Sequence, residues 1–203
     1  MESSGTYKNR ALQSLEGKWG KAAIAILVVV IISGGISSVA TKPFDPTIGV
    51  SLNSIWTLLC LPLTWGSTVY FLNLIRNHDI SIERLFDGYK DFVRIFLAEL
   101  LITIAIAIGF VLFIVPGIVV ALMFAMTDFI LKDNKEMSST DAIQLSMNMM
   151  KGHKMQLFGL TLSLIGWAIL SMLTLGIGFL FLVPYYESAK AHFYEDLKAE
   201  QGL

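Results

Sequence analysis

One apolar run, from Ile95 to Leu131, constrains the fold of this chain more than any other stretch. It holds 37 residues, of which only Glu99 and Asp128 carry a charge. A single helix of that length would measure about 56 Å at 1.5 Å per residue, whereas the hydrocarbon core of a bilayer is about 30 Å thick. The run must therefore fold back on itself. We expect the reversal at Val115–Gly117 (VPG), because proline removes an amide donor and disfavours helical geometry at the preceding residue.

Composition places the chain among membrane proteins. Hydrophobic residues make up 55% of the 203 positions and charged residues only 15%, far from the usual mix of a soluble domain. The polar intervals are short, so residues 1–203 are expected to form a single integral membrane domain. The net charge is −1 and acidic residues accompany the basic ones locally, so nucleic acid is not an expected partner. The expected partner is the lipid bilayer, with a membrane protein or a second copy of the chain as further partners.

The remaining apolar runs predict an all-α protein with six transmembrane helices arranged as three hairpins. The last apolar run, which begins near Met155, is also too long for one span and is divided near residues 174–178, by the same reasoning as the run from Ile95 to Leu131. A cytoplasmic amphipathic segment, 1–21, precedes them. The alternative for the first run is a cleaved signal peptide, but its 19 apolar residues exceed the roughly 7–15 typical of one. The predicted spans cover about 22–40, 55–75, 95–115, 116–131, 156–174 and 176–194.

The distribution of basic residues predicts the orientation. With a cytoplasmic N-terminus and six spans, only Lys42 of the 15 Lys and Arg residues lies outside. Cytoplasmic loops of membrane proteins carry an excess of Lys and Arg, whereas an odd number of spans would scatter these charges over both sides. Both termini are therefore expected in the cytoplasm.

A weak threefold repeat accompanies the hairpins. Each unit begins with a short amphipathic segment, reaches a glycine, crosses outward, and returns through a helix that proline opens. Glycine would let the chain turn from the membrane surface into the membrane, and proline fits a first helical turn, where its missing N–H has no partner. Gly and Pro also punctuate unrelated membrane helices, so coincidence is the alternative. The repeated positions are Gly17, Gly88 and Gly152, and Pro62, Pro116 and Pro184.

Four ionisable residues in the predicted spans form the candidate polar site. Glu187 and Lys190 share one face of the sixth span, while Glu99 and Asp128 lie in the cytoplasmic halves of the third and fourth. A charge at the bilayer centre costs roughly 2.5–3.5 kcal/mol, and ionisable groups there often mark solute or proton pathways. The alternative is structural, with Glu187 and Lys190 paired and the other two acids reaching the interface or bonding to hydroxyls such as Thr103 and Thr127.

Other chemistry has little support. His78, His153 and His192 all fall on the predicted cytoplasmic side, but their spacing matches no metal-ligand pattern, so neither a metal nor another cofactor is expected. Phosphate-binding loops and nucleophile motifs are absent from the sequence. A catalytic function is therefore not expected.

Several blocks along the chain resemble one family. In order, they are "GKWGKA", "LFDGY", "IVPGIVVALMFAMTDFIL", "SMNMMKGHKMQLFGLTLSLIGW", "LTLGIGFLFLVPY" and "AHFYEDL". Together they resemble the bacterial integral membrane family known as domain of unknown function 975. The resemblance covers nearly the whole chain and implies a six-span protein of the bacterial cytoplasmic membrane, but it assigns no catalytic or binding residue.

The functional expectation is a non-enzymatic structural, lipid-interacting or partner-binding membrane protein. Its main rival is a small-solute or ion transporter or channel centred on Glu187, and an intramembrane enzyme is the third reading. A transporter should show a water-accessible cavity at Glu187. A lipid or partner binder should show an apolar groove between hairpins, and an enzyme should show titratable groups that converge.

Overall fold

The structure is a computed structural model that describes residues 2–35 and 46–202. In these ranges every regular element is a helix and there is no strand, as the apolar periodicity predicts. The elements are α1 (Ser4–Leu15), α2 (Trp19–Val30), the π-helix η1 (Ile31–Gly35), α4 (Pro46–Leu59), α5 (Leu61–Ile75), the 3₁₀ helix η2 (Ile82–Tyr89), α6 (Phe92–Leu112), α7 (Ile114–Phe124), α8 (Thr127–Asp133), α9 (Ser139–Met149), α10 (Lys154–Leu162), α11 (Ile165–Leu173) and α12 (Phe179–Gln201).

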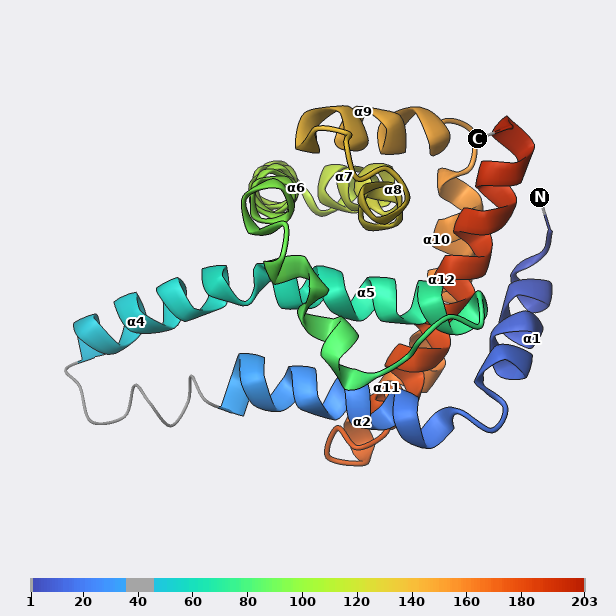
Figure 1. The fold of residues 1–203 in the computed structure, drawn as a ribbon, viewed down its shortest axis with the longest axis horizontal. Helices are drawn as coiled ribbons and strands as arrows, with labels where there is room; N and C mark the ends of the chain where they lie inside the picture. Colours follow the sequence, from blue (N-terminus) through green and yellow to red (C-terminus); the bar gives the residue numbers. More distant parts are fainter. Residues whose placement is uncertain (1, 36–45, 203) are drawn as a thin grey trace.

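Over the described residues these helices group into three hairpins, each preceded by a short helix. The first hairpin contains α2 with α4 and α5, the second α6 with α7 and α8, and the third α10 and α11 with α12. The preceding short helices are α1, η2 and α9. Figure 1 shows that the hairpins are not parallel: α2 and α5 run across the view, α6 and α7 run along the line of sight, and α12 runs steeply upward to the C-terminus. The helices therefore do not form a simple parallel bundle.

Among the described residues, four helical segments are long and apolar enough to cross a membrane: Leu52–Ile75, Phe92–Leu112, Ile114–Asp133 and Lys154–Leu173. The first predicted span is represented by a shorter apolar helix, Trp19–Gly34, and its predicted end at residue 40 lies outside the described residues. The sixth falls in α12, which is long enough but carries four charged residues within its first 18 positions. Length and apolarity thus support a membrane protein with four candidate spans.

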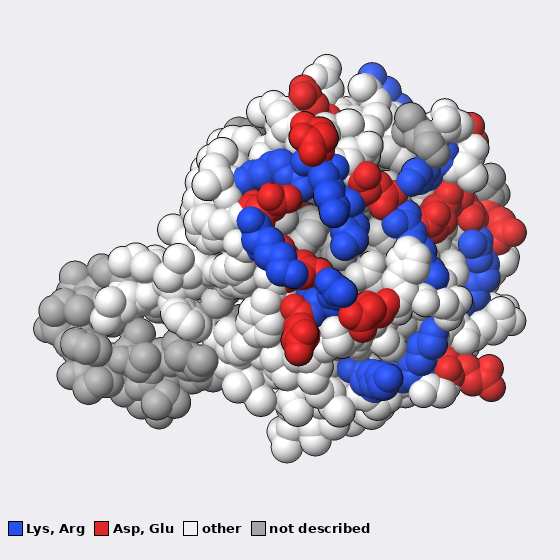
Figure 2. All heavy atoms as spheres, in the orientation of Figure 1, with Lys and Arg blue, Asp and Glu red and all other residues white. Residues whose placement is uncertain are grey.

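The far ends of the second and third hairpins are apolar and exposed. Val111 is 86% exposed near the end of α6, and Leu175 is 95% exposed in the turn before α12. Charged side chains instead gather on the near face in Figure 2. This segregation suits a chain whose hairpins are surrounded by lipid or by another apolar surface, with the charged face outside it.

The three repeated glycines have different structural roles. Gly17 and Gly152 adopt positive φ angles of 70° and 83°, the left-handed conformation that glycine adopts without steric cost. Gly88 is not in that region, which corrects the expectation of a common role. A Cβ atom there would lie 2.4 Å from the carbonyl oxygen of Pro62, so glycine at 88 permits close approach of η2 to α5.

The repeated prolines also differ in position. Pro62 lies in the first turn of α5 and Pro116 is the third residue of α7. However, α4 precedes α5 in the same candidate span, so Pro62 marks a break within the returning segment rather than its start. Pro184 lies inside α12, which begins five residues earlier. Proline therefore opens the returning helix only in the second hairpin.

A candidate polar site where the three hairpins meet

The core lies at the junction of the hairpins. Its larger buried cluster draws apolar side chains from α5, α6, α8 and α12, among them Leu72, Ile95, Phe129 and Phe193. Phe129 also stacks on Tyr194, with ring centroids 5.0 Å apart. The polar site borders this core, so helix packing determines the positions of its side chains.

Glu187 and Lys190 form an ion pair on α12. The Lys190 ammonium lies 2.9 Å from Glu187 Oε2 and donates a hydrogen bond to Oε1 at 3.1 Å. The two side chains are only 14% and 12% exposed. The ammonium also lies 5.6 Å from the centre of the Phe129 ring and 5.8 Å from that of Tyr186, within the range of cation–π attraction. Lys190 is therefore held by an acid and two aromatic rings.

The other two predicted residues meet beside this pair. The carboxyl groups of Glu99 and Asp128 lie close to each other, and the Asp128 carboxyl also lies close to the Thr68 hydroxyl. Lys190 lies within electrostatic reach of both carboxyls. Two negatively charged carboxylates side by side repel each other, and the nearby Lys190 ammonium offsets part of that repulsion.

The structure thus brings together all four predicted site residues and adds Thr68 from the first hairpin. Each hairpin contributes: α5 supplies Thr68, α6 and α8 supply the two acids, and α12 supplies the ion pair. The expected hydroxyl partners are not the ones used. The Thr127 hydroxyl is buried without a hydrogen-bond partner among the described residues, and Asp128 lies beside Glu99 and Thr68 instead.

A break between α7 and α8 positions Asp128. The helix is interrupted at Ala125 and Met126, which would leave backbone groups unsatisfied. The buried Ser146 hydroxyl of α9 bridges the break: it donates to the Met123 carbonyl at 2.9 Å and accepts from the Met126 amide at 3.2 Å. Trp65 Nε1 donates to the Asp128 carbonyl oxygen at 3.1 Å. Both contacts fix the start of α8 and therefore the position of its acid.

A second ionic layer lies nearer the charged face and was not predicted from the sequence. Arg76, at the end of the first hairpin, donates to both carboxylate oxygens of Asp133 at 2.6 and 2.8 Å, and to Glu195 at 2.7 Å. Asp133 also accepts from Lys198 at 2.6 Å and from the Tyr194 hydroxyl at 3.1 Å. The hydrogen bonds with Asp133 raise the pKa of Arg76 above its ordinary value, so the guanidinium remains charged.

This layer joins the same three hairpins as the polar site. Arg76, Asp133 and Glu195 lie at least 57 positions apart from one another along the chain. No local motif connects them, and in the sequence they resemble the other charges that follow apolar runs. From the sequence, Arg76 therefore served only as one of the basic residues that predict the orientation of the chain in the membrane.

The histidines lie apart from this junction. His192 hydrogen-bonds to Ser14 at 2.8 Å, and His153 lies 3.6 Å from Glu200. Within residues 2–35 and 46–202, no group of three or more His, Cys, Asp and Glu side chains is arranged to hold a metal ion.

Comparison with known proteins gives a family. The model described as "Protein of unknown function (DUF975)" matches residues 1–121 and 106–201. The chain belongs to the DUF975 family. No curated protein and no solved structure matches it. Membership in DUF975 agrees with the sequence blocks that suggested it, and it assigns no function to the junction residues.

Proposed function

We propose that this DUF975 chain is a non-enzymatic, lipid-binding protein of the bacterial cytoplasmic membrane. In this proposal six helices span the membrane as a threefold repeat of hairpins, and both termini are cytoplasmic. The ionic layers at the junction hold the hairpins together, while the apolar surfaces contact lipid. A membrane-protein partner or a second copy of the chain would bind the same apolar surfaces.

An apolar groove between two hairpins carries this proposal. The groove has a volume of about 480 Å³, within the range of ligand pockets. The groove is lined by Trp167 and Leu170 of α11 and by Phe181 of α12. Leu12 of α1 and Trp19 of α2 line it from the first hairpin. Few polar groups lie in it, so it cannot satisfy a strongly polar solute. A lipid acyl chain is the apolar ligand that a bilayer supplies.

The test is the lipid that the purified protein retains. Leu170→Trp adds bulk inside the groove, whereas Ile169→Trp adds the same ring at the adjacent exposed position of α11 that does not line it. After extensive detergent washing, native mass spectrometry should show bound phospholipid on the wild type and on I169W, and much less on L170W. Absence of retained lipid on the wild type, or equal loss in both variants, would contradict the proposal.

Single cysteines in a Cys60→Ser background test the topology. Leu175→Cys at a hairpin tip should react with a membrane-impermeant maleimide only from outside the cell, because that tip is expected on the outer side of the membrane. Lys135→Cys and Gln201→Cys should react only from the cytoplasmic side of inverted vesicles. Labelling of Leu175→Cys from the cytoplasmic side would contradict the six-span arrangement.

A transporter is the second candidate, and the convergence of Glu99, Asp128 and the Glu187–Lys190 pair favours it. Such a cluster of ionisable groups is also what an intramembrane enzyme would need. Glu187→Cys in the same background distinguishes these readings from a structural site. Rapid labelling from the cytoplasmic side that a solute blocks would support transport. Failure to label in folded protein would support a buried structural pair.

A further inference from the structure

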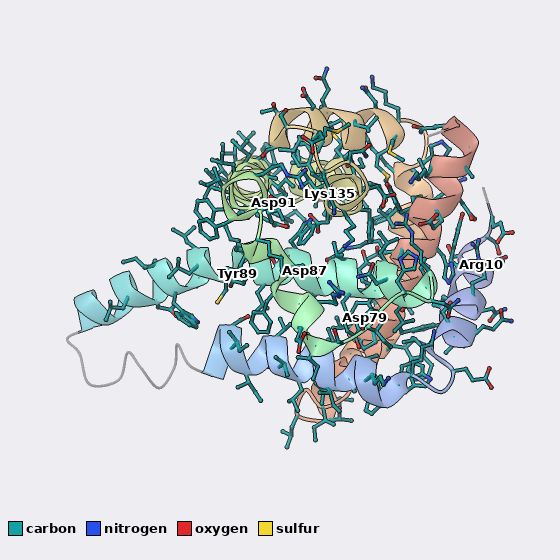
Figure 3. All side chains as sticks on the ribbon, viewed as in Figure 1. Arg10, Asp79, Asp87, Tyr89, Asp91 and Lys135 are labelled. Carbon is teal, nitrogen blue, oxygen red and sulfur yellow. The ribbon has the colours of Figure 1, made fainter. Side chains whose placement is uncertain are left out.

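A separate pocket opens on the charged face, at one end of the second hairpin. Its volume is about 380 Å³, and its walls come from η2, the start of α6, the end of α8 and Trp65 of α5. Figure 2 shows basic and acidic side chains around a hollow on this near face. Asp87, Asp91 and Lys135, labelled in Figure 3, come from η2, the residue before α6 and the turn after α8. This pocket is distinct from the apolar groove and from the polar site.

The pocket carries an excess of positive charge. Five cationic side chains line it against two carboxylates. Asp87 is already paired with Lys90 at 2.7 Å and with Arg84 at 3.5 Å, and Asp91 with Arg94 at 3.3 Å. The cationic residues are Arg84, Lys90, Arg94, Lys132 and Lys135.

Lys132 and Lys135 supply the positive charge that the two carboxylates of the pocket do not neutralise. Among the described residues neither ammonium forms an ion pair or a hydrogen bond. Lys135 and Arg84 repel the Lys132 ammonium, and the attraction of Asp87 and Asp133 offsets that repulsion only through carboxylates that already have closer cationic partners. An anion between the two lysines would relieve the repulsion, because like charges near a protein surface cost free energy that a counter-ion recovers.

Arg94 holds the segment that carries these lysines. Its guanidinium donates to the carbonyl oxygens of Leu131, Asn134 and Met137, at 3.2, 3.0 and 3.2 Å. These hydrogen bonds give partners to the carbonyl groups that the end of α8 leaves unpaired, and they fix the turn that follows. Lys132 and Lys135 are therefore presented on a fixed backbone rather than on a free loop, which lowers the entropic cost of binding.

The position of the pocket indicates the source of the anion. α6 begins and α8 ends beside it, so it lies where two candidate spans leave the apolar layer. A row of aromatic rings, Phe86, Tyr89, Phe92 and Phe96, runs from η2 onto α6 with successive centroids 5.2–6.3 Å apart. Tyr and Trp side chains at span ends typically lie at headgroup level, and Tyr89 of this row is one of them. Phospholipid headgroups occupy this depth.

We propose that this pocket binds the phosphate of an anionic phospholipid headgroup, with Lys132 and Lys135 as its direct contacts. Such a lipid and a free phosphate ion both present a phosphate group to the pocket. The position of the pocket at the level of the lipid headgroups favours the lipid. Lysine serves as a point charge for phosphate, which suits a headgroup that arrives along the membrane plane. This inference rests on the proposed lipid-binding function and names the headgroup class.

The experiment uses the full chain in neutral detergent micelles and follows its unfolding temperature as a ligand is added. The ligands are phosphatidylglycerol, phosphatidylcholine and inorganic phosphate. The test variant is Lys132→Gln with Lys135→Gln. The control variant is Lys151→Gln with Lys154→Gln, which removes the same charge from a segment that does not line the pocket. Each basic residue near an anionic surface contributes about fivefold in affinity, so the test variant should bind phosphatidylglycerol more than tenfold more weakly.

The outcomes are separable. Stabilisation of the wild type and of the control variant by phosphatidylglycerol alone, with a much weaker response of the test variant, supports the headgroup site. Stabilisation of the test variant by phosphatidylglycerol as large as that of the wild type overturns it, because the lipid then binds elsewhere. Stabilisation of the wild type by phosphate, lost in the test variant, keeps the phosphate site and assigns it to a soluble anion. Equal responses of both variants overturn the site, yet leave the proposed function standing if the wild type still retains lipid in its apolar groove.

Discussion

Arg76 and Asp133 form a bidentate ion pair, with nitrogen–oxygen distances of 2.6 and 2.8 Å, that joins the end of the first hairpin to the end of the second. Glu195 of α12 bonds to the same guanidinium and brings in the third hairpin. One arginine therefore connects all three hairpins at the charged face. The polar site is built from the same three hairpins.

Replacing Arg76 with leucine should destabilise the protein strongly. Asp133 is 11% exposed, so the change leaves a mostly buried carboxylate with only Lys198 and Tyr194 as partners. Breaking one side of a buried pair typically costs about 3–5 kcal/mol. Denaturant unfolding in mixed micelles measures the loss. Arg84→Leu is the control: its closest partner, Asp79, is 55% exposed and screened by solvent, and its second partner, Asp87, keeps Lys90 at 2.7 Å, so a small loss is expected. Equal losses in both variants would show that Arg76 does not act as the connector.

The Glu187–Lys190 pair should behave as a coupled unit if its role is structural. Lys190→Met alone removes the cation beside three acids, and Glu187→Gln alone removes its closest partner. We expect each single change to lower the unfolding free energy by about 2–4 kcal/mol and the double change to cost less than the sum. A double-mutant cycle of unfolding free energies measures the coupling. Strictly additive losses would contradict a structural pair.

Gly66 should not tolerate a side chain. A Cβ atom there would lie 1.9 Å from the carbonyl oxygen of Leu85, and that oxygen belongs to the backbone of η2. Gly66→Ala must push η2 away from α5, at a cost on the order of 3 kcal/mol. Gly20→Ala is the matched control, because it also adds a methyl group to a helical glycine but meets no atom within 4 Å. The control should be neutral or slightly stabilising. The unfolding temperature should therefore fall for Gly66→Ala, whereas it should stay unchanged or rise slightly for Gly20→Ala.

Tyr7 should make the attachment of α1 sensitive to alkali. Its ring packs edge-on against Phe193 of α12 at 5.4 Å, and burial raises its pKa to about 12. The phenol is neutral in both states below about pH 10, so its stabilising contribution is fully present there. Between about pH 10 and 12 the unfolded chain loses the proton while the folded chain keeps it, and stability falls. Unfolding free energies measured across this range should fall more steeply for the wild type than for Tyr7→Phe. Equal slopes would show that Tyr7 titrates normally.

The sequence predicts much of the local structure, because local structure depends on residues that are close together. The long run from Ile95 to Leu131 does reverse, at an extended residue, Phe113, with Pro116 in the first turn that follows. The short helices before each hairpin occur where amphipathic segments were expected. The four residues of the candidate site also lie close together in the fold, as expected of ionisable groups in apolar segments, which need partners.

What the amino-acid sequence by itself determined is therefore the class of protein, its helices and the residues that must find partners. Only the tertiary structure decided which partners they find. Asp128 lies beside Glu99 and Thr68 while the Thr127 hydroxyl stays without a partner, Arg76 connects three hairpins, and Gly88 permits a close backbone approach rather than a left-handed turn. These contacts join residues from different hairpins that are inclined to one another. Helical periodicity reports only on one helix at a time, so it carries no information about that inclination.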